Sequence, residues 1–194
     1  MTTILAIDTA TNACSAAIWA DGVIIGSRYE EMVRGQAERL VPMVAEIFND
    51  AKCAIKDLDL VAVTSGPGAF TGIRVGLAAA RGFALSAEVP CIGLTTLEAI
   101  AAKITWTPGK LLVALDSKRK DVYFQIFEAN GVPVTGADVG FPEQVGIIAA
   151  QHILAGTRVI LAGDAAIAVS EHLVRGGIYA EMSGIPYPNA EALA

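Results

Sequence analysis

The sequence passes twice through the same order of expected elements: a strand, a hairpin, a helix, a strand and a helix. Residues 4–8 open the first passage and residues 110–116 open the second, and each of these apolar runs ends in an aspartate followed by a hydroxyl residue. An Asp-Gly pair at residues 21–22 and an Asn-Gly pair at residues 130–131 supply the two hairpin turns. The halves share this order but no residue-level repeat. It predicts two similar α/β lobes, each with a mixed sheet whose first three strands form an antiparallel meander.

Local patterns set the expected boundaries of these elements. Leu40, Val44 and Ile47 follow the 3.6-residue period within residues 36–51, which predicts a helix there, with Pro42 near its first turn or at a kink. The expected strands are residues 4–8, 14–20, 23–29, 58–64, 91–94, 110–116, 122–128, 132–139 and 158–163, and the expected helices are residues 36–51, 71–87, 95–104, 143–154 and 165–174. We therefore expect an N-terminal lobe of residues 1–104 and a C-terminal lobe of residues 105–194.

The high apolar content does not indicate a membrane protein. The mean hydropathy is +0.52 and 54% of the residues are hydrophobic. However, the longest uncharged stretches, residues 60–73 and 144–157, are shorter than the roughly 18 apolar residues of a membrane-spanning helix. The first residues lack the basic region of a secretory leader, and the three widely spaced cysteines fit neither a disulfide framework nor a thiolate metal site. We expect a cytoplasmic protein.

The charge balance limits the partners that this chain can bind directly. The chain has 14 Lys+Arg and 20 Asp+Glu, a net charge of −6. This balance argues against nucleic-acid binding by the chain alone, because such binding requires positive charge to neutralise phosphates. Charged residues make up only 18% of the chain, below the usual ~25%, which indicates extra buried surface such as a subunit interface.

Residues 65–84 form a glycine-rich turn that leads into a helix. Gly66, Gly68 and Gly72 have neither the spacing of a dinucleotide-binding fingerprint nor the Gly-Lys-Ser/Thr ending of a Walker A loop. Two interpretations remain open for this turn. It is either a tight strand-to-helix connection or a phosphate-binding turn at a helix N-terminus.

The helix that follows is rich in small residues. Glycines inside a helix cost about 1 kcal/mol each relative to alanine, so something must offset them, and close packing would do so. Arg74, Ala78 and Arg81 fall on one face of this helix. The small residues therefore indicate either packing on the sheet of the same lobe or contact with another subunit.

Candidate catalytic groups are scarce. His152 and His172 are the only histidines, and they do not form a His-x-x-x-His or His-Glu-x-x-His pair. The sequence also contains no Gly-x-Ser-x-Gly elbow. We expect no catalytic residue, no metal site and no enzyme activity of its own.

Four colinear segments are similar to the TsaB (YeaZ) family. They are residues 4–11 (Ile-Leu-Ala-Ile-Asp-Thr-Ala-Thr), residues 66–76 (Gly-Pro-Gly-Ala-Phe-Thr-Gly-Ile-Arg-Val-Gly), residues 114–123 (Ala-Leu-Asp-Ser-Lys-Arg-Lys-Asp-Val-Tyr) and residues 163–165 (Gly-Asp-Ala). The second segment is the most specific of the four, and together they cover nearly the whole chain. The resemblance implies a two-lobed actin-like/sugar-kinase (ASKHA, ribonuclease H-like) α/β fold.

The resemblance also implies a partner role. Members of this family are non-catalytic partners of TsaD, the transferase that places a threonylcarbamoyl group on N6 of the adenosine beside the anticodon of some tRNAs. TsaE, an ATPase, joins the complex, and members alone often form homodimers through the same surface. The resemblance therefore implies contact with tRNA only through the complex, and no cofactor, with ATP or ADP bound only weakly or in the complex. The expected contact residues on the helices at 36–51 and 71–87 are Gln36, Arg39, Leu40, Met43, Arg74, Leu77, Ala78 and Arg81.

In actin-like and sugar-kinase proteins, acids at strand ends hold Mg²⁺ and phosphate together with the hairpin that follows. The resemblance therefore implies a nucleotide cleft. Its candidate residues are Asp8, Thr9, Thr11, Gly66, Gly68, Asp116, Gly163 and Asp164. The turn at residues 8–12 has no glycine to let backbone N–H groups converge on a phosphate, so we interpret the cleft as vestigial.

The chain departs from the family pattern at two places. The related TsaD carries a His-x-x-x-His metal pair on its first long helix, whereas this chain has Gln36 where a histidine is expected. Its last residues, 191–194, replace a Pro-x-Tyr-Leu-Arg-like tail, so we expect a shortened C-terminal lobe.

Two alternative functions are an ATP-dependent phosphotransferase that uses Asp8 and Asp116, and an M22-type glycoprotease, which the missing histidine pair disfavours.

Overall fold

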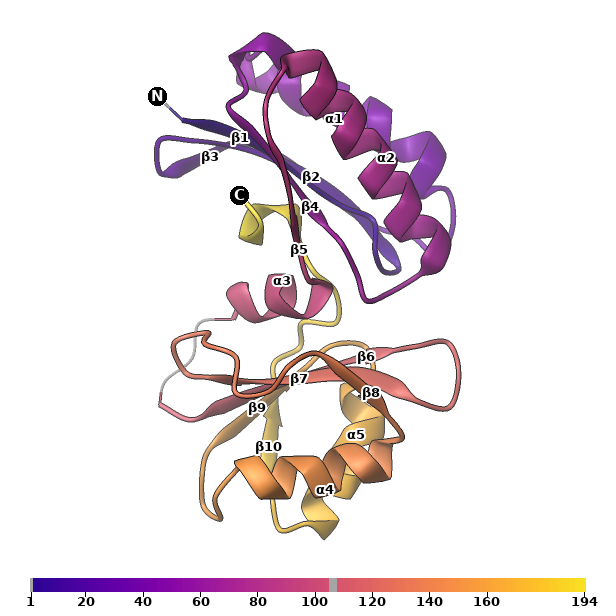
Figure 1. Ribbon diagram of the computed structural model, residues 1–194, viewed down its shortest axis with the longest axis vertical. Helices are drawn as coiled ribbons and strands as arrows, with labels where there is room; N and C mark the ends of the chain where they lie inside the picture. The colour runs from indigo at the N-terminus through magenta and orange to yellow at the C-terminus, as the bar shows by residue number, and fades with distance from the viewer. Residues whose placement is uncertain (1, 105–107) are drawn as a thin grey trace. The chain divides into compact units, whose positions relative to one another are not determined.

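The computed structural model describes residues 2–104 and 108–194, which divide into two compact units (Figure 1). The first unit runs to Ala99 and includes Pro188–Ala194, and the second is Ile100–Tyr187. We expected the lobes to divide between residues 104 and 105, whereas the two units divide between Ala99 and Ile100; residues 105–107 lie outside the described part of the chain. The last seven residues return to the first unit, so a division of the chain at one point does not describe the two units.

The first unit is a five-stranded mixed sheet in the order β3-β2-β1-β4-β5. Its elements are β1 (Thr3–Asp8), β2 (Ala13–Ala20), β3 (Val23–Glu31), α1 (Gln36–Ala51), η1 (Ile55–Asp57), β4 (Leu60–Thr64), α2 (Phe70–Ala87), β5 (Cys91–Leu94), η2 (Ala190–Ala192) and the first part of α3 (Thr96–Ala102), the helix within which the two units divide. Strands β1, β2 and β3 are antiparallel neighbours, and β4 and β5 add in parallel. The expected hairpin turn is present, with Asp21 and Gly22 at φ 45° and 96°.

The two faces of this sheet pack against different layers. Leu5 and Ile18 point to the face covered by α1 and α2, where they pack against Ile47. Ala6 and Ala17 point to the opposite face, because successive side chains of a strand alternate. This second layer is closed by α3 and by the C-terminal segment, whose buried side chains include Leu193.

The C-terminal segment is attached to the first sheet by hydrogen bonds as well as by burial. The backbone N–H of Ala190 donates to Ser15 Oγ at 3.0 Å, and Ser27 Oγ donates to the carboxylate of Glu191. Ala190 is fully buried. Residues 188–194, which we expected in the C-terminal lobe, therefore complete the core of the first unit.

The second unit is also a five-stranded mixed sheet, in the order β10-β9-β6-β7-β8. Its elements are β6 (Lys110–Asp116), β7 (Val122–Glu128), β8 (Asp138–Gly140), α4 (Pro142–His152), β9 (Val159–Ala162), α5 (Ala166–Arg175) and β10 (Ala180–Met182). Helices α4 and α5 lie on the same side of this sheet (Figure 1), and their core residues Val145 and Leu173 pack with Phe124 and Leu112.

The second hairpin differs from the sequence expectation. The returning strand, expected at residues 132–139, is regular only over Asp138–Gly140. Pro133 lacks the N–H that a ladder needs and forms only an isolated bridge to Phe127. Next to it, the N–H of Ile126 donates to Thr135 Oγ1 at 3.1 Å, so a side chain takes the place of a strand partner. Strand β10 was not predicted at all.

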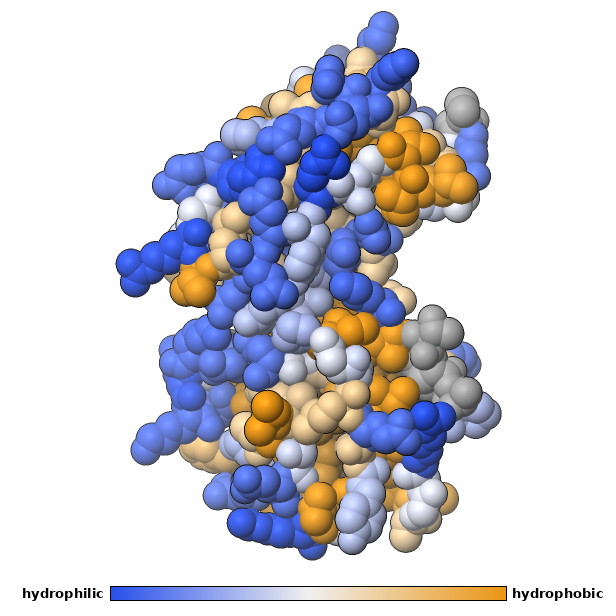
Figure 2. Space-filling model, turned by 180° about the vertical axis from the view of Figure 1, so that it is seen from behind, coloured by the Kyte–Doolittle hydropathy of each residue, from blue (hydrophilic) through white to orange (hydrophobic). Residues whose placement is uncertain are grey.

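The apolar content of the chain is taken up mainly by the two cores. Apolar side chains also reach the surface of each unit in separate patches (Figure 2). Among the described helices, none has the length and apolar character needed to cross a membrane.

Candidate functional site

Asp8, the first residue of the predicted nucleotide cleft, lies inside the first unit. Its side chain shares the sheet face of Ala6 and is fully buried. Thr64 Oγ1 donates to Asp8 Oδ1 at 2.6 Å and the N–H of Ala10 donates to the same oxygen at 3.1 Å, while Oδ2 has no hydrogen-bond partner in the described part of the chain. Burial raises the pKa of Asp8 to about 6, although both hydrogen bonds lower it. This carboxyl group is not presented to a solvent-borne Mg²⁺.

The β1–β2 turn packs directly against the start of α2. Thr9 Oγ1 donates to the Gly72 carbonyl at 2.7 Å, and the N–H of Ala69 donates to the Ala10 carbonyl at 2.7 Å. A Cβ on Gly68 would collide with the Ala10 carbonyl oxygen, and one on Gly72 with the Thr9 carbonyl oxygen. The space beside these glycines is filled by the chain's own backbone. This favours the interpretation of residues 65–72 as a tight connection.

Gly66 and Thr11 complete the part of the predicted cleft that lies in the first unit. Gly66 adopts a φ of 106° and its peptide bond to Pro67 is cis. Its carbonyl accepts the N–H of Thr96, at the start of α3, at 2.8 Å. Thr11 is buried in the β1–β2 turn, with a hydroxyl group that has no partner among the residues that the structure describes.

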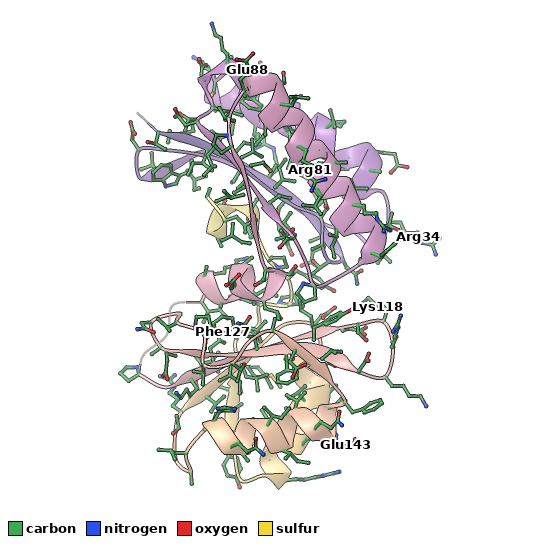
Figure 3. All side chains as sticks on the ribbon, in the orientation of Figure 1. Arg34, Arg81, Glu88, Lys118, Phe127 and Glu143 are labelled. Atoms are coloured by element: carbon green, nitrogen blue, oxygen red, sulfur yellow. The ribbon has the colours of Figure 1, made fainter. Side chains whose placement is uncertain are left out.

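The remaining cleft candidates lie in the second unit and form an ion-pair cluster there. Lys118, at the β6–β7 turn (Figure 3), places Nζ 3.1 Å from Asp116 Oδ2 and 3.6 Å from Asp164 Oδ2. The N–H of Asp116 donates to Asp164 Oδ1 at 2.8 Å. Burial raises the pKa of Asp164, while this N–H and the Lys118 charge lower it. Lys118 thus takes the position between two carboxylates where a cation would be held.

Gly163 is required by backbone geometry rather than by a ligand. Its φ is 95°, a left-handed conformation that favours glycine. A Cβ at this position would also collide with the Ala114 carbonyl oxygen. The two groups of cleft candidates lie in different units, and a single nucleotide cleft stays a prediction.

The expected contact residues of α1 divide into core and surface. Leu40 and Met43 are 1% and 0% exposed, because they lie on the apolar side of the helix that faces the sheet. Including them was wrong for a surface contact. Gln36 Nε2 donates to the Met32 carbonyl at 3.1 Å and the Thr11 carbonyl at 3.3 Å, which holds the entry to the helix.

Arg39 lies in an ion-pair network that joins α1 to β3. Its guanidinium donates to the carboxylates of Glu30 and Glu46. Glu46 also lies near Arg28, which in turn pairs with Asp50. Only 24% of the Arg39 side chain is exposed. Arg39 therefore serves mainly to join α1 to β3 within the unit and offers little surface to a partner.

Three of the four expected contact residues of α2 lie together on an exposed face of the helix. Arg74, Ala78 and Arg81 are exposed, and Arg81 lies on α2 in Figure 3. Leu77 is partly buried and packs on the core. The guanidinium of Arg74 lies 3.3 Å from the centre of the Phe70 ring, a cation–π contact.

Sequence reasoning missed two residues on this face. Phe70 and Leu85 are 69% and 80% exposed, and helical spacing places them beside Arg74, Ala78 and Arg81. We call these five residues the α2 stripe. The spacing of 70, 74, 78, 81 and 85 in the sequence already contained this signal.

A short basic run that sequence reasoning missed lies at the β6–β7 turn. Lys118, Arg119 and Lys120 are consecutive, and the turn that carries them is held by Ser117, whose hydroxyl donates to Asp121. Neither His152 nor His172 belongs to a metal-binding cluster in the part of the chain that the structure describes. In the described ranges, no three His, Cys, Asp or Glu side chains are placed to hold a metal ion.

Comparison with known proteins supplies sequence relatives. The family model of TsaD, tRNA N6-adenosine threonylcarbamoyltransferase, matches residues 28–145, more than half of the chain. The tRNA threonylcarbamoyladenosine biosynthesis protein TsaB of Escherichia coli (strain K12) is 39% identical over 133 residues, which are 66% of this chain and 57% of that protein. The protein of the same name from Bacillus subtilis (strain 168) is 30% identical over 131 residues, 67% of this chain and 57% of that protein. The matches thus span less than two thirds of these relatives.

Solved structures agree with these relatives. YeaZ from Pseudomonas aeruginosa has a TM-score of 0.80 and 26% identity, and the match covers 100% of this chain and 89% of that chain. Component A of the Acidaminococcus fermentans (R)-2-hydroxyglutaryl-CoA dehydratase has a TM-score of 0.58 at 14% identity, covering 100% and 96%, which shows likeness of fold alone. The expected actin-like α/β fold class is confirmed, and the chain belongs to the TsaB (YeaZ) family.

Proposed function

We propose that this chain is a non-catalytic subunit of the machinery that forms threonylcarbamoyladenosine in tRNA, and that it binds and activates a TsaD-like transferase. The names of the Escherichia coli and Bacillus subtilis relatives support the modification role. The observation that carries the partner role is the α2 stripe.

The α2 stripe has the composition of a helix-pairing surface. Phe70 and Leu85 offer large apolar side chains at its two ends, and both lose contact with water when a partner helix covers them. Ala78, between them, is small enough for that helix to approach closely. Arg74 and Arg81 supply charges whose exposed positions favour orientation and association rate more than affinity.

We propose the same surface for a second copy of the chain when the transferase is absent, and a TsaE-like ATPase as the further member of the complex. The net charge of −6 supports tRNA contact through the partner and not through this chain. The burial of Asp8 and the pairing of Lys118 with two aspartates support a role without a nucleotide cofactor of its own.

The test is an Ala78→Glu variant, assayed with a TsaD-like transferase and a TsaE-like ATPase. Co-elution in size-exclusion chromatography measures assembly, and mass spectrometry of digested tRNA measures the modified adenosine. We expect both to fall by roughly tenfold or more, because covering an unpaired carboxylate costs on the order of 1.4 kcal/mol or more. Unchanged circular dichroism would show that the variant is folded.

Ala168→Glu on α5 is the matched control, since Ala168 is also exposed on a helix but lies in the second unit. This variant should assemble and support modification as the wild type does. If Ala78→Glu behaves like Ala168→Glu, the α2 stripe is not the partner surface and the proposed role loses its support.

A further inference from the structure

The α2 stripe carries positive charge only. Arg74 and Arg81 are its two charged residues, and both are exposed. Among the residues that the structure describes, neither forms an ion pair. The chain as a whole has a net charge of −6, so this helix face is opposite in sign to the protein that carries it.

The acids closest to α2 do not neutralise this face. Helix α2 contains no aspartate or glutamate, and Glu88 follows its last residue, at the end of the helix away from Arg34 (Figure 3). On the neighbouring helix α1, Glu46 is bound by Arg39. Glu38 lies near the start of α2, where it lines the same cavity as Thr71, but within the described ranges it forms no ion pair with an arginine of the stripe.

The side chain of Arg74 is already held in place by its neighbour. Its guanidinium lies 3.3 Å from the centre of the Phe70 ring. Stacking covers one face of the planar guanidinium, while the N–H donors lie in its plane and stay available. Such a fork of donors matches the two oxygens of a carboxylate. Because Phe70 already restricts the side chain, less conformational freedom is lost when Arg74 binds an acid.

A second copy of the chain cannot supply that acid from the same surface. A two-fold axis that pairs the α2 helices in parallel places Arg74 against Arg74 of the second copy and Arg81 against Arg81. An antiparallel pair that crosses near Ala78 places Arg74 against Arg81, because the two arginines lie on opposite sides of Ala78 at similar distances along the helix. In both directions like charges meet, which opposes association.

We propose that the α2 stripe selects a partner helix that carries carboxylates over a second copy of the chain. The carboxylates lie seven residues apart on that helix, because Arg74 and Arg81 are separated by seven residues, about two helical turns. Apolar and small side chains face the rest of the stripe. This selection rests on the proposed partner role and adds the chemistry that decides between the two occupants.

The test is the double variant Arg74→Gln/Arg81→Gln, which removes both charges and keeps a long polar side chain at each position. Binding to a TsaD-like transferase, measured by biolayer interferometry, should weaken roughly fivefold, mainly through slower association. Added sodium chloride should weaken the binding of the wild type and have little effect on that of the variant. Equal binding of the two proteins at low and at high salt overturns the proposal.

The same variant should have the opposite effect on the chain alone. Its homodimer, measured by sedimentation equilibrium, should be roughly fivefold tighter than that of the wild type, a gain that misfolding does not produce. Removing two positive charges takes the net charge from −6 to −8, which by itself opposes association of two copies. A tighter homodimer therefore reports on the stripe, and an unchanged or weaker one contradicts the proposal.

Lys120→Gln/Arg175→Gln is the matched control, because it also removes two exposed positive charges, but from the second unit. It should behave as the wild type does in both measurements. Ala78→Glu distinguishes failure of this selection from failure of the proposed function. If Ala78→Glu blocks assembly and the arginine variant assembles normally, the stripe is the partner surface but its charges do not select the partner. If neither variant affects assembly, the proposed function fails as well.

Discussion

Asp8 lies at a strand end, a position suited to catalysis, but its surroundings keep the carboxyl group away from solvent. It ends β1 as the strand-end acids of actin-like folds do, yet its carboxyl group is fully buried and one oxygen has no partner within the described ranges. Burial raises its pKa from 3.8 to about 6. The folded state holds the Asp8 proton more tightly than the unfolded state does. The contribution of the Asp8 proton to the free energy of unfolding is therefore fully present below pH 3.8 and is lost as the pH rises through about 6.

Replacing this carboxyl group by an amide should therefore stabilise the first unit near neutral pH. A shift from 3.8 to about 6 corresponds to about 3 kcal/mol at 1.36 kcal/mol per pH unit. We expect Asp8→Asn to unfold with a free energy higher by up to that amount at pH 7.5, and the gain to shrink towards pH 4. Urea unfolding followed by Trp19 fluorescence in a Trp106→Phe background measures it. A gain that is the same at both pH values would contradict the assignment.

At the scale of single elements, α2 shows how one helix divides its small residues between two tasks. Gly72, Gly76, Ala80 and Ala84 are buried, and a Cβ on Gly76 would lie 2.6 Å from Thr9 Oγ1. These positions let the helix approach the β1–β2 turn of the same unit. Ala78 and Gly82 face outward instead. The buried face thus confirms packing within the same unit, whereas contact of the outward face with another subunit stays a prediction.

Two alanine substitutions in α2 should have opposite effects. A Cβ on Gly82 would have no atom within 4 Å, so Gly82→Ala should raise the free energy of unfolding by about 1 kcal/mol through helix propensity. Gly72→Ala should lower it by about 2 kcal/mol or more, because the new methyl group meets the Thr9 carbonyl oxygen. Urea denaturation of both variants provides the comparison. A stabilised Gly72→Ala variant would show that the turn is loosely packed.

Local patterns predicted most elements because they depend on neighbouring residues. The apolar period of α1 and the Asp21-Gly22 turn are signals of this kind, and α1 spans the expected residues Gln36–Ala51. The same period places Leu40 and Met43 on the inner face, which excludes them from a surface contact. The strand expected at residues 132–139 is only partly formed, because Pro133 and a Thr135 side chain interrupt the ladder.

At the scale of the whole molecule, the feature that local patterns could not predict is the path of the last residues. Residues 183–194 show neither a helical nor a strand period, and their partners lie far away in the sequence. The bond from Ala190 to Ser15 spans 175 positions. Such contacts depend on tertiary packing, which local sequence patterns do not reveal.

This path predicts that a substitution near the C-terminus acts on the first unit. Leu193 is 7% exposed and packs in the layer of Ala6, Ala17 and Ala62, so Leu193→Ala should destabilise that unit by about 2 kcal/mol. Hydrogen exchange should accelerate at the amides of β1, β2 and β4 and stay unchanged in β6 and β9. Leu154→Ala serves as the control, because Leu154 is 82% exposed and its removal should leave both sheets as protected as before. Equal acceleration in both units after Leu193→Ala would mean that they unfold together, and acceleration in the second sheet alone would contradict the return of the chain to the first.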